Sequence, residues 1–191
     1  MARARQRRAT ARPGSPVERP VKGLTSIALM RRTSFAEMHC SVAQCLEVVG
    51  EWWSMLIVRD ASLGVSRFDD FQERLGISRN VLHQRLTHLM DHGVLERVAY
   101  QDHPPRYDYR LTEKGRDLWP VVAAMRQWGD RWAAPEGAPL EIVHRGCGHV
   151  SHVEQRCSAC GEVLELRALR AVPGPGARPS DELIPTRPAQ G

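Results

Sequence analysis

Apolar residues recur at intervals of three and four over most of residues 33–92, which predicts a series of amphipathic helices. A first helix is expected over 33–50. A second helix, apolar on most of its faces, is expected over 52–64, where Gly64 ends it. A third is expected to begin at a cap on Ser66, with Phe68, Phe71 and Leu75 facing inward. The chain therefore begins its folded part as a helical domain.

A fourth helix is expected over 78–92, with Ser78 as its N-cap. One side of this helix carries an apolar stripe that must pack on the preceding helices: Leu82, Leu86, Leu89 and Met90. At about 100° per residue, the polar side chains fall on the opposite arc. They are Arg79, Asn80, His83, Gln84 and Thr87. Gly76 lies in the short turn before the helix, which fits a helix-turn-helix.

Two strand-like runs follow the fourth helix, VLERVAY and YDYRLT, joined by the proline-containing turn DHPPR. They predict a β-hairpin, or wing, over 95–112 with Arg106 at its tip. The fold class is therefore mainly α with a small β wing, a winged helix-turn-helix. The remaining alternative for the polar face of the helix is a solvated surface with no ligand.

Those residue types at those positions match the chemistry of double-stranded DNA. Arginine can bond guanine bidentately and asparagine or glutamine can bond adenine in the major groove, so Arg79, Asn80, His83 and Gln84 are the expected base contacts. Phosphate is expected at Arg85, on the edge of the arc, and at Ser78 with the helix N-terminus. Arg106 is expected to enter a minor groove or meet phosphate, with His103 as a weaker candidate.

Residues 40–132 carry a family resemblance in the runs RFDDFQERLGIS, VLHQRL and PPRYDYRLTEKG. They resemble the HxlR-type winged helix-turn-helix transcriptional regulators of bacteria. The resemblance implies a homodimeric DNA-binding repressor or activator without catalysis. Trp52 beside Trp53, and the pair Arg79 and Asn80, depart from the pattern common in relatives, so an operator sequence does not follow from it.

A terminal helix is expected within 111–132, with Pro120 bending it or delaying its start. Its apolar stripe is longer than the three-helix head can cover: Leu118, Val121, Val122, Met125, Trp128 and Trp132. We expect this stripe to pair with the first helix across a two-fold axis, giving a homodimer. The alternative is that the helix folds back on its own head.

Past residue 134 the pattern changes to short strand-like runs around two similar turns. His144 and Cys147 in the first turn mirror Cys157 and Cys160 in the second, each pair separated by two residues and followed by glycine. Four such ligands suit a structural Zn²⁺, and two turns of this kind predict a zinc-ribbon-like β module over 140–170. His149 and His152 are rival fourth ligands. The alternative is a relict ribbon with free thiols and no metal.

Cys40 and Cys45 require a separate interpretation. The resemblance places Cys40 where several family members carry a cysteine at the start of the first helix, in some of them a sensor of oxidants or electrophiles. A thiolate there would be activated by a helix N-terminus or by nearby arginines. The alternative is a small buried apolar residue, which is the expected role of Cys45.

The net charge of +5 is concentrated at the N-terminus, where residues 1–22 hold seven basic residues and Glu18, a net of +6. We expect a disordered basic arm over 1–23, able to hold phosphates or only to aid solubility. The winged domain is expected over 24–133, a linker over 134–139 and a disordered proline-rich tail over 171–191.

No apolar run approaches the length of a membrane span and no secretory signal is present, so a cytoplasmic location is expected. The sequence lacks a glycine-rich phosphate loop, GxSxG and HExxH, so an enzyme is not expected. The favoured function is a dimeric DNA-binding transcriptional regulator, responsive to an oxidant or small ligand if Cys40 is a sensor. The alternative is a nucleic-acid-associated scaffold whose winged head and ribbon dock protein or RNA.

Overall fold

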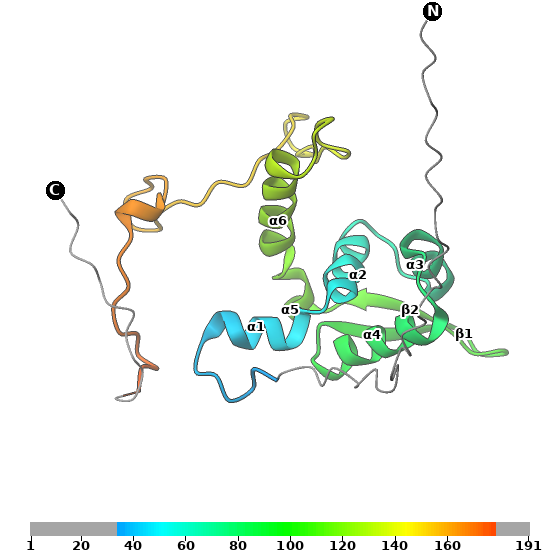
Figure 1. The fold of residues 1–191 in the computed structure, drawn as a ribbon. Helices are drawn as coiled ribbons and strands as arrows, with labels where there is room; N and C mark the ends of the chain where they lie inside the picture. The colour runs from blue at the N-terminus through cyan, green and yellow to red at the C-terminus, as the bar shows by residue number, and fades with distance from the viewer. Residues whose placement is uncertain (1–33, 179–191) are drawn as a thin grey trace, which may run out of the picture. The chain divides into compact units, whose positions relative to one another are not determined.

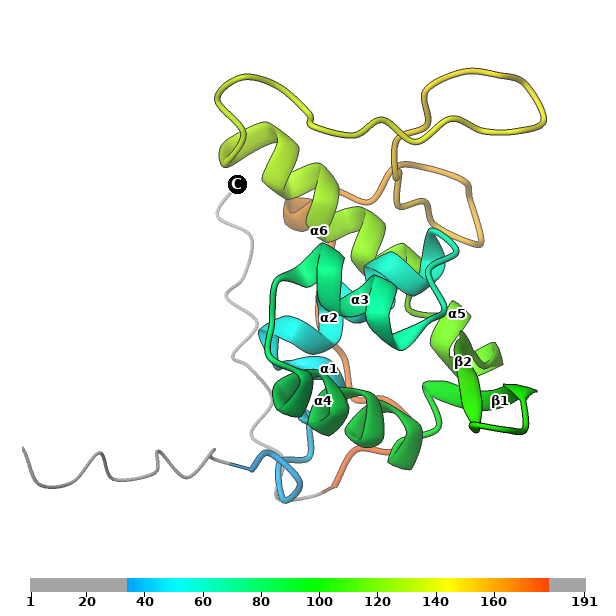
Figure 2. The ribbon, with the colours of Figure 1, turned by 90° about the vertical axis from the view of Figure 1, so that its right-hand side faces the viewer.

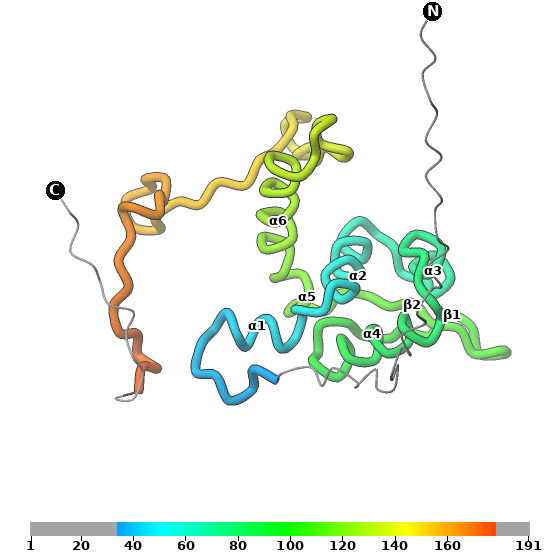
Figure 3. The backbone as a smooth tube through the Cα atoms, in the orientation of Figure 1, coloured from blue at the N-terminus to red at the C-terminus, as the bar shows by residue number. Residues whose placement is uncertain are grey.

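The computed structural model describes residues 34–178, and the expected basic arm and the end of the tail lie outside these residues. Figure 1 shows the helices and the hairpin in order along the chain, and Figure 3 traces the same path as a tube. The elements are α1 (Ser41–Val49), α2 (Trp52–Ser62), α3 (Phe68–Leu75), α4 (Arg79–Asp91), β1 (Leu95–Gln101), β2 (Arg106–Leu111), α5 (Glu113–Arg116), α6 (Trp119–Trp132) and a 3₁₀ turn, η1 (Leu166–Ala168).

The core lies where α2, α3 and α4 meet the base of the hairpin. Its fully buried side chains come from every one of these elements, which makes the head a single packed unit. The largest of them are Ile57, Val58, Phe71, Leu82, Leu86, Leu89 and Val94. The expected inward stripe of the fourth helix is therefore confirmed for its three leucines, whereas Met90 is only partly buried. α6 packs on α2 through Val122 and Ala123.

The first helix begins at Ser41 rather than at residue 33, because side chains of α1 hold the preceding segment in turns. Glu47 Oε2 accepts a hydrogen bond from Phe35 N at 2.7 Å. Gln44 Nε2 donates to three backbone oxygens of that segment, the shortest bond being 2.8 Å to Met38 O. These bonds satisfy polar groups that a longer helix would otherwise bond within itself.

The turn between α3 and α4 follows the helix-turn-helix expectation. Gly76 adopts the left-handed conformation (φ 64°) that ends α3, a conformation that costs other residues conformational energy. The expected cap at Ser66 is wrong: the N-cap of α3 is Arg67, and Ser66 Oγ donates instead to Asp108 Oδ1 of β2 at 3.2 Å.

The two strands pair antiparallel, with Leu95 opposite Leu111 at the base and Gln101 opposite Arg106 at the tip. Tyr109 N donates to Ser66 O at 2.7 Å, and Arg67 forms a β-bridge with Asp108. The hairpin is thereby attached to the start of α3 as well as to α4 before it. The terminal helix is interrupted at 117–118, between α5 and α6, and Pro120 occupies the first turn of α6, which agrees with the expected delay of the helix start.

Candidate nucleic-acid interface

The polar face of α4 is open to solvent. Arg79, Asn80, His83 and Gln84 are exposed, and Thr87 is partly buried. Figure 2 shows α4 along the lower edge of the group of helices, with the hairpin beyond its end. The three buried leucines on the other side of α4 fix its rotation about its axis, so these four side chains face outward together.

Ser78 caps α4 as the sequence predicts. Its Oγ accepts a hydrogen bond from Val81 N at 3.3 Å. Besides Val81 N, the backbone N–H groups of Arg79 and Asn80 in the first turn have no partner inside the helix, and they lie at the positive end of its dipole. A phosphate oxygen is a suitable partner for such N–H groups.

Arg79 is held in place by α3. Its guanidinium donates to Asp69 Oδ1 at 2.9 Å and to Gln72 Oε1 at 3.0 Å, and its carbon lies 4.7 Å above the centre of the Phe68 ring. These three partners were not predicted as site residues, because their proximity depends on the angle between two helices and leaves no periodic signal. Arg79 remains 67% exposed and has further N–H donors for a ligand.

Arg85 does not face outward, contrary to the expectation of a phosphate contact. Its side chain is only 23% exposed, and its Nη2 lies 3.2 Å from Glu51 Oε1 at the start of α2. At about 100° per residue Arg85 lies beside Leu89, at the margin of the buried leucine stripe, where Glu51 at the start of α2 meets it. Arg85 therefore links α4 to α2 in the head.

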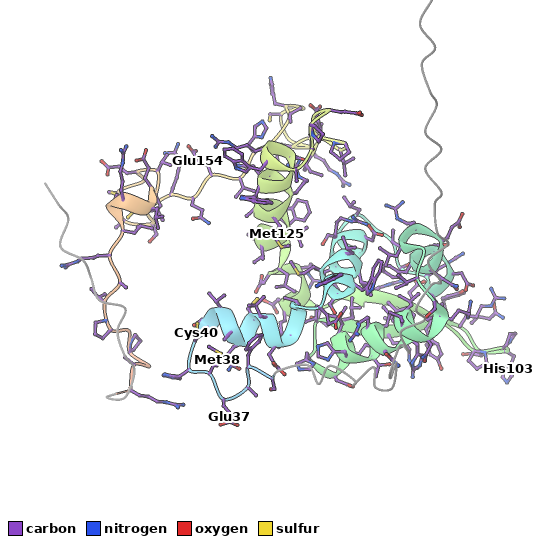
Figure 4. The ribbon with its side chains drawn as sticks, in the orientation of Figure 1. Glu37, Met38, Cys40, His103, Met125 and Glu154 are labelled. Atoms are coloured by element: carbon purple, nitrogen blue, oxygen red, sulfur yellow. The ribbon has the colours of Figure 1, made fainter. Side chains whose placement is uncertain are left out.

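The hairpin adds basic and aromatic side chains beside α4. His103 and Arg106 are exposed at its tip, and Figure 4 shows His103 at the far end of the loop. Two arginines that sequence reasoning missed lie over tyrosine rings of the hairpin. Arg97 stacks 4.2 Å from the centre of the Tyr107 ring, and Arg67 stacks 5.1 Å from that of Tyr100. Such stacking holds a guanidinium in place while leaving its donors free.

Asp108 links the hairpin to the segment that precedes α3, through its hydrogen bond from Ser66. A hydrogen bond from Arg110 Nη2 at 2.8 Å, joined by the one from Ser66, holds the pKa of Asp108 below its usual value against the opposing effect of burial. On the opposite strand face, Tyr109 lies beside Phe68, and burial raises the pKa of its hydroxyl. Asp108 is therefore a positioning residue for the wing.

Comparison with known proteins assigns this arrangement to a family. The family model described as "HxlR-like helix-turn-helix" matches residues 48–137. Regulator Rv3095 of Mycobacterium tuberculosis (strain ATCC 25618 / H37Rv), named an uncharacterized HTH-type transcriptional regulator, is 43% identical over 137 residues, which cover 71% of this chain and 87% of the relative. This chain belongs to the HxlR-like helix-turn-helix family.

Solved structures agree with the assignment. PA1607, described as a proposed transcription factor, is 41% identical, with a TM-score of 0.66 over 73% of this chain and 99% of its own. PA1374 of Pseudomonas aeruginosa, described in the same way, is 40% identical, with a TM-score of 0.54 over 73% of this chain and 96% of its own. The family resemblance and the winged helix-turn-helix fold expected from the sequence are thus confirmed.

Within this HxlR-like chain, the structure distinguishes Cys40 from Cys45 by their exposure. Cys40 is exposed at the N-cap of α1, and Figure 4 shows it at the start of that helix. The alternative of a buried Cys40 is therefore wrong for the single chain. Cys45 is partly buried and packs against the core cluster.

The two C-terminal turns lie beyond the HxlR-like match. In the first, His144 Nδ1 lies 3.3 Å from Cys147 Sγ. In the second, Cys157 and Cys160 are in hydrogen-bond contact, and the backbone N–H groups of Cys160 and Ala159 lower the pKa of the Cys157 thiol. The expected strands are reduced to single β-bridges. Within residues 34–178, no three histidine, cysteine or acidic side chains gather at one point, so the four expected zinc ligands stand as two separate pairs.

No helix within residues 34–178 combines the length and the apolar character that crossing a membrane requires.

Proposed function

We propose that this chain regulates transcription by binding double-stranded DNA as a homodimer. In this proposal α4 enters the major groove and the tip of the hairpin contacts the adjacent minor groove or the backbone. The observation that carries the proposal is the face of α4 on which Arg79, Asn80, His83 and Gln84 are exposed together. These side chains present the donors and acceptors that distinguish base pairs in the major groove.

The positively charged groups near α4 favour a contact with DNA over a helix face that meets only solvent. A solvated face needs no neighbouring cations, whereas a duplex needs phosphate contacts on both sides of the helix that enters its groove. Here the capped N-terminus of α4 offers one such contact, and the hairpin tip adds the exposed Arg106. The names of the relatives, HTH-type transcriptional regulators, support the same role.

Two exposed apolar faces support dimerisation. On α1, Val42 is 68% exposed and Leu46 is also exposed. On α6, Met125 is exposed, and Trp128 and Trp132 are 64% and 66% exposed. Burying one such side chain contributes about 1.5–3 kcal/mol, so covering both faces with a second copy would be strongly favourable. A two-fold axis would then place two α4 helices about one DNA turn apart, roughly 34–36 Å.

The proposal is tested by footprinting the full chain on DNA upstream of its own gene, followed by anisotropy titrations on the protected site. Arg106→Ala should weaken binding to every duplex by a similar factor and lower the slope of log affinity against log salt by about 0.9. Gln84→Ala should instead relax discrimination at one base pair of each half-site, by about 1–3 kcal/mol.

Gln155→Ala is the matched control for Gln84→Ala, because it removes the same side chain from an exposed position outside the head. It should leave DNA binding unchanged. Absence of any protected site, together with equal weak binding of the wild type and both interface variants to all duplexes, would contradict the proposal. That outcome would favour the alternative, a scaffold that docks protein or RNA.

A further inference from the structure

The two C-terminal turns are copies of one another in backbone structure. The first occupies 142–151 and the second 155–164, so equivalent residues differ by 13 in number (157 − 144 = 13). In the first turn His144 N donates to His149 O at 2.9 Å, and in the second Cys157 N donates to Glu162 O at 2.8 Å. The bond Ser151 N to Ile142 O (2.7 Å) likewise matches Leu164 N to Gln155 O (2.9 Å).

The repeat extends to the loop inside each turn. Gly148 N donates to His144 O at 2.8 Å, and Gly161 N donates to Cys157 O at 2.9 Å. Both glycines adopt the left-handed conformation, with φ of 73° and 76°. Since this backbone returns the chain directly after the second candidate ligand, both turns present residues one and four of the loop on the same side.

The repeat also indicates which of the three histidines, His144, His149 or His152, is the candidate fourth ligand. Its register makes His144 equivalent to Cys157, and Cys147 equivalent to Cys160. His149 and His152 are instead equivalent to Glu162 and Glu165, which follow the loop. In addition, His144 Nδ1 lies 3.3 Å from Cys147 Sγ. This is close to the distance of about 3.5 Å expected between a nitrogen and a sulfur ligand of one tetrahedral zinc ion.

Each turn alone supplies two ligands, whereas a structural zinc ion takes four. Ten residue steps separate Cys147 from Cys157 (157 − 147 = 10), enough to span up to about 33 Å when extended and ample for the two turns to meet. The turns also expose apolar side chains with no core to cover them: Val143, Val150, Val163 and Leu164. Bringing the turns together would cover these side chains.

We propose that the two turns close on one structural zinc ion per chain, held by His144 Nδ1 and by the thiolates of Cys147, Cys157 and Cys160. All four positions are filled by protein, so the site has no open position for substrate or water. Val153, between the turns, donates its N–H to Gln127 Oε1 of α6 at 2.8 Å. The closed module is therefore anchored on the same helix that carries Trp128 and Trp132.

The first experiment measures the zinc content of the full chain, purified under reducing conditions without chelator. One zinc per chain is expected, and loss of at least nine-tenths of it in His144→Ala and in Cys160→Ser. His149→Ala, His152→Ala and Cys45→Ser are matched controls that should keep one zinc. Helical circular dichroism should be unchanged in all variants, because α1 to α6 pack without the turns.

Replacement of zinc by Co²⁺ gives a second measurement that does not depend on any variant. Tetrahedral Co²⁺ with three thiolates should show intense visible absorption and a sulfur-to-cobalt charge-transfer band, and the spectrum should change in His144→Ala. Zinc content near zero in the wild-type chain would overturn the site. Full zinc occupancy in His144→Ala would overturn the ligand set.

A site shared between two chains is distinguished by mixing. One chain carries His144→Ala with Cys147→Ser, and the other carries Cys157→Ser with Cys160→Ser, and the two are denatured and refolded together. If each chain closes on its own ion, the mixture holds no zinc. About half an ion per chain in the mixed dimer would overturn closure within one chain.

Discussion

Arg79 Nη1 of α4 lies 2.9 Å from the Asp69 carboxylate of α3. This pair joins the first turns of both helices of the helix-turn-helix, and both partners are more than half exposed. An exposed ion pair of this kind contributes little to folding. Its effect is to orient Arg79 and to place one negative charge beside the surface proposed to meet DNA.

Asp69→Ala should therefore separate affinity from specificity. We expect binding to arbitrary duplexes to strengthen several-fold, since a negative charge near phosphate is removed, while the preference for the protected site falls because Arg79 loses its orientation. The free energy of unfolding should change by less than about 1 kcal/mol. Competition titrations at two salt concentrations measure both effects.

Asp70→Ala is the control, since Asp70 is also exposed in the first turn of α3 but has no ion pair with Arg79 among the described contacts. If both variants lose the same amount of discrimination, orientation of Arg79 is not the cause.

Arg85→Ala should destabilise the head without altering its electrostatic contact with DNA. The Arg85 and Glu51 side chains are both about three quarters buried, so removal of one leaves the other poorly solvated. We expect a loss of about 1–2 kcal/mol in the free energy of unfolding, reduced from the value for a fully buried pair because water reaches both groups. Urea denaturation measures it.

Glu51→Ala should give a loss of similar size, and the double variant should lose less than the sum of the two. The salt slope of DNA binding should remain that of the wild type in Arg85→Ala. A slope lowered by about one unit would instead restore Arg85 as a phosphate contact.

These two arginines show what the sequence could and could not predict. The capped start of α4 and its leucine stripe follow from neighbouring residues, so Ser78 and Leu82 were predicted correctly. Arg85 was expected at the edge of the polar arc, but at about 100° per residue it lies roughly 240° from Arg79 and only roughly 40° from Leu89, beside the leucine stripe. Its partner Glu51, 34 positions earlier (85 − 51 = 34), leaves no periodic signal in the sequence. The same limit applies to Ser66, whose hydroxyl is bound by a strand residue 42 positions away.

The start of the first helix was mispredicted for a related reason. Residues 33–40 have helical spacing of apolar residues, but within 34–40 the bonds from Gln44 and to Glu47 hold the chain in turns. Periodicity detects which side of a segment is apolar and does not detect competing side-chain bonds. For the C-terminal turns, spacing alone indicated both pairs of candidate ligands, and their proposed closure around one ion would depend on a metal that the sequence does not contain.

Trp128→Glu should convert the proposed dimer into a folded monomer. The side chain is 64% exposed in the single chain, so the charge costs little in the monomer but would be buried at the interface. Sedimentation at micromolar concentration should show the monomer mass, and binding to the full pseudo-palindrome should weaken more than tenfold. Leu166→Glu, at an exposed position on η1, is the control and should stay dimeric.

Cys40→Ser should make DNA binding insensitive to oxidant if the exposed thiol at the N-cap of α1 is the sensor. A sulfenic acid or disulfide at this position would alter the surface proposed to form the dimer. Wild-type protein should lose the footprint on treatment with peroxide and recover it with dithiothreitol. Cys45→Ser should respond as the wild type does. An unchanged loss of binding in Cys40→Ser would exclude this cysteine as the sensor.

Asp108→Asn should loosen the hairpin in a pH-dependent way. Because the pKa of Asp108 is lowered in the folded chain, its carboxylate stabilises the fold above the usual aspartate pKa, and this contribution is lost as pH falls below it. We expect the variant to be less stable by about 1 kcal/mol at pH 7. The difference between the variant and the wild type should begin to narrow below about pH 4 and should close as pH falls through the lowered pKa of Asp108 in thermal melts. A constant difference from pH 7 to pH 3 would contradict this role.

The bond from Tyr109 N to Ser66 O, at 2.7 Å, and the β-bridge between Arg67 and Asp108 attach the hairpin to the start of α3, the first helix of the helix-turn-helix. In the proposed complex, the bases beneath α4 and the groove beneath Arg106 would therefore lie at one set separation along the duplex. Inserting a single base pair between them shifts the second contact by about 3.4 Å and rotates it by about 35°. Under the proposed mode of binding, this attachment would let the protein distinguish DNA sites by the spacing between their contacts as well as by the identity of their bases.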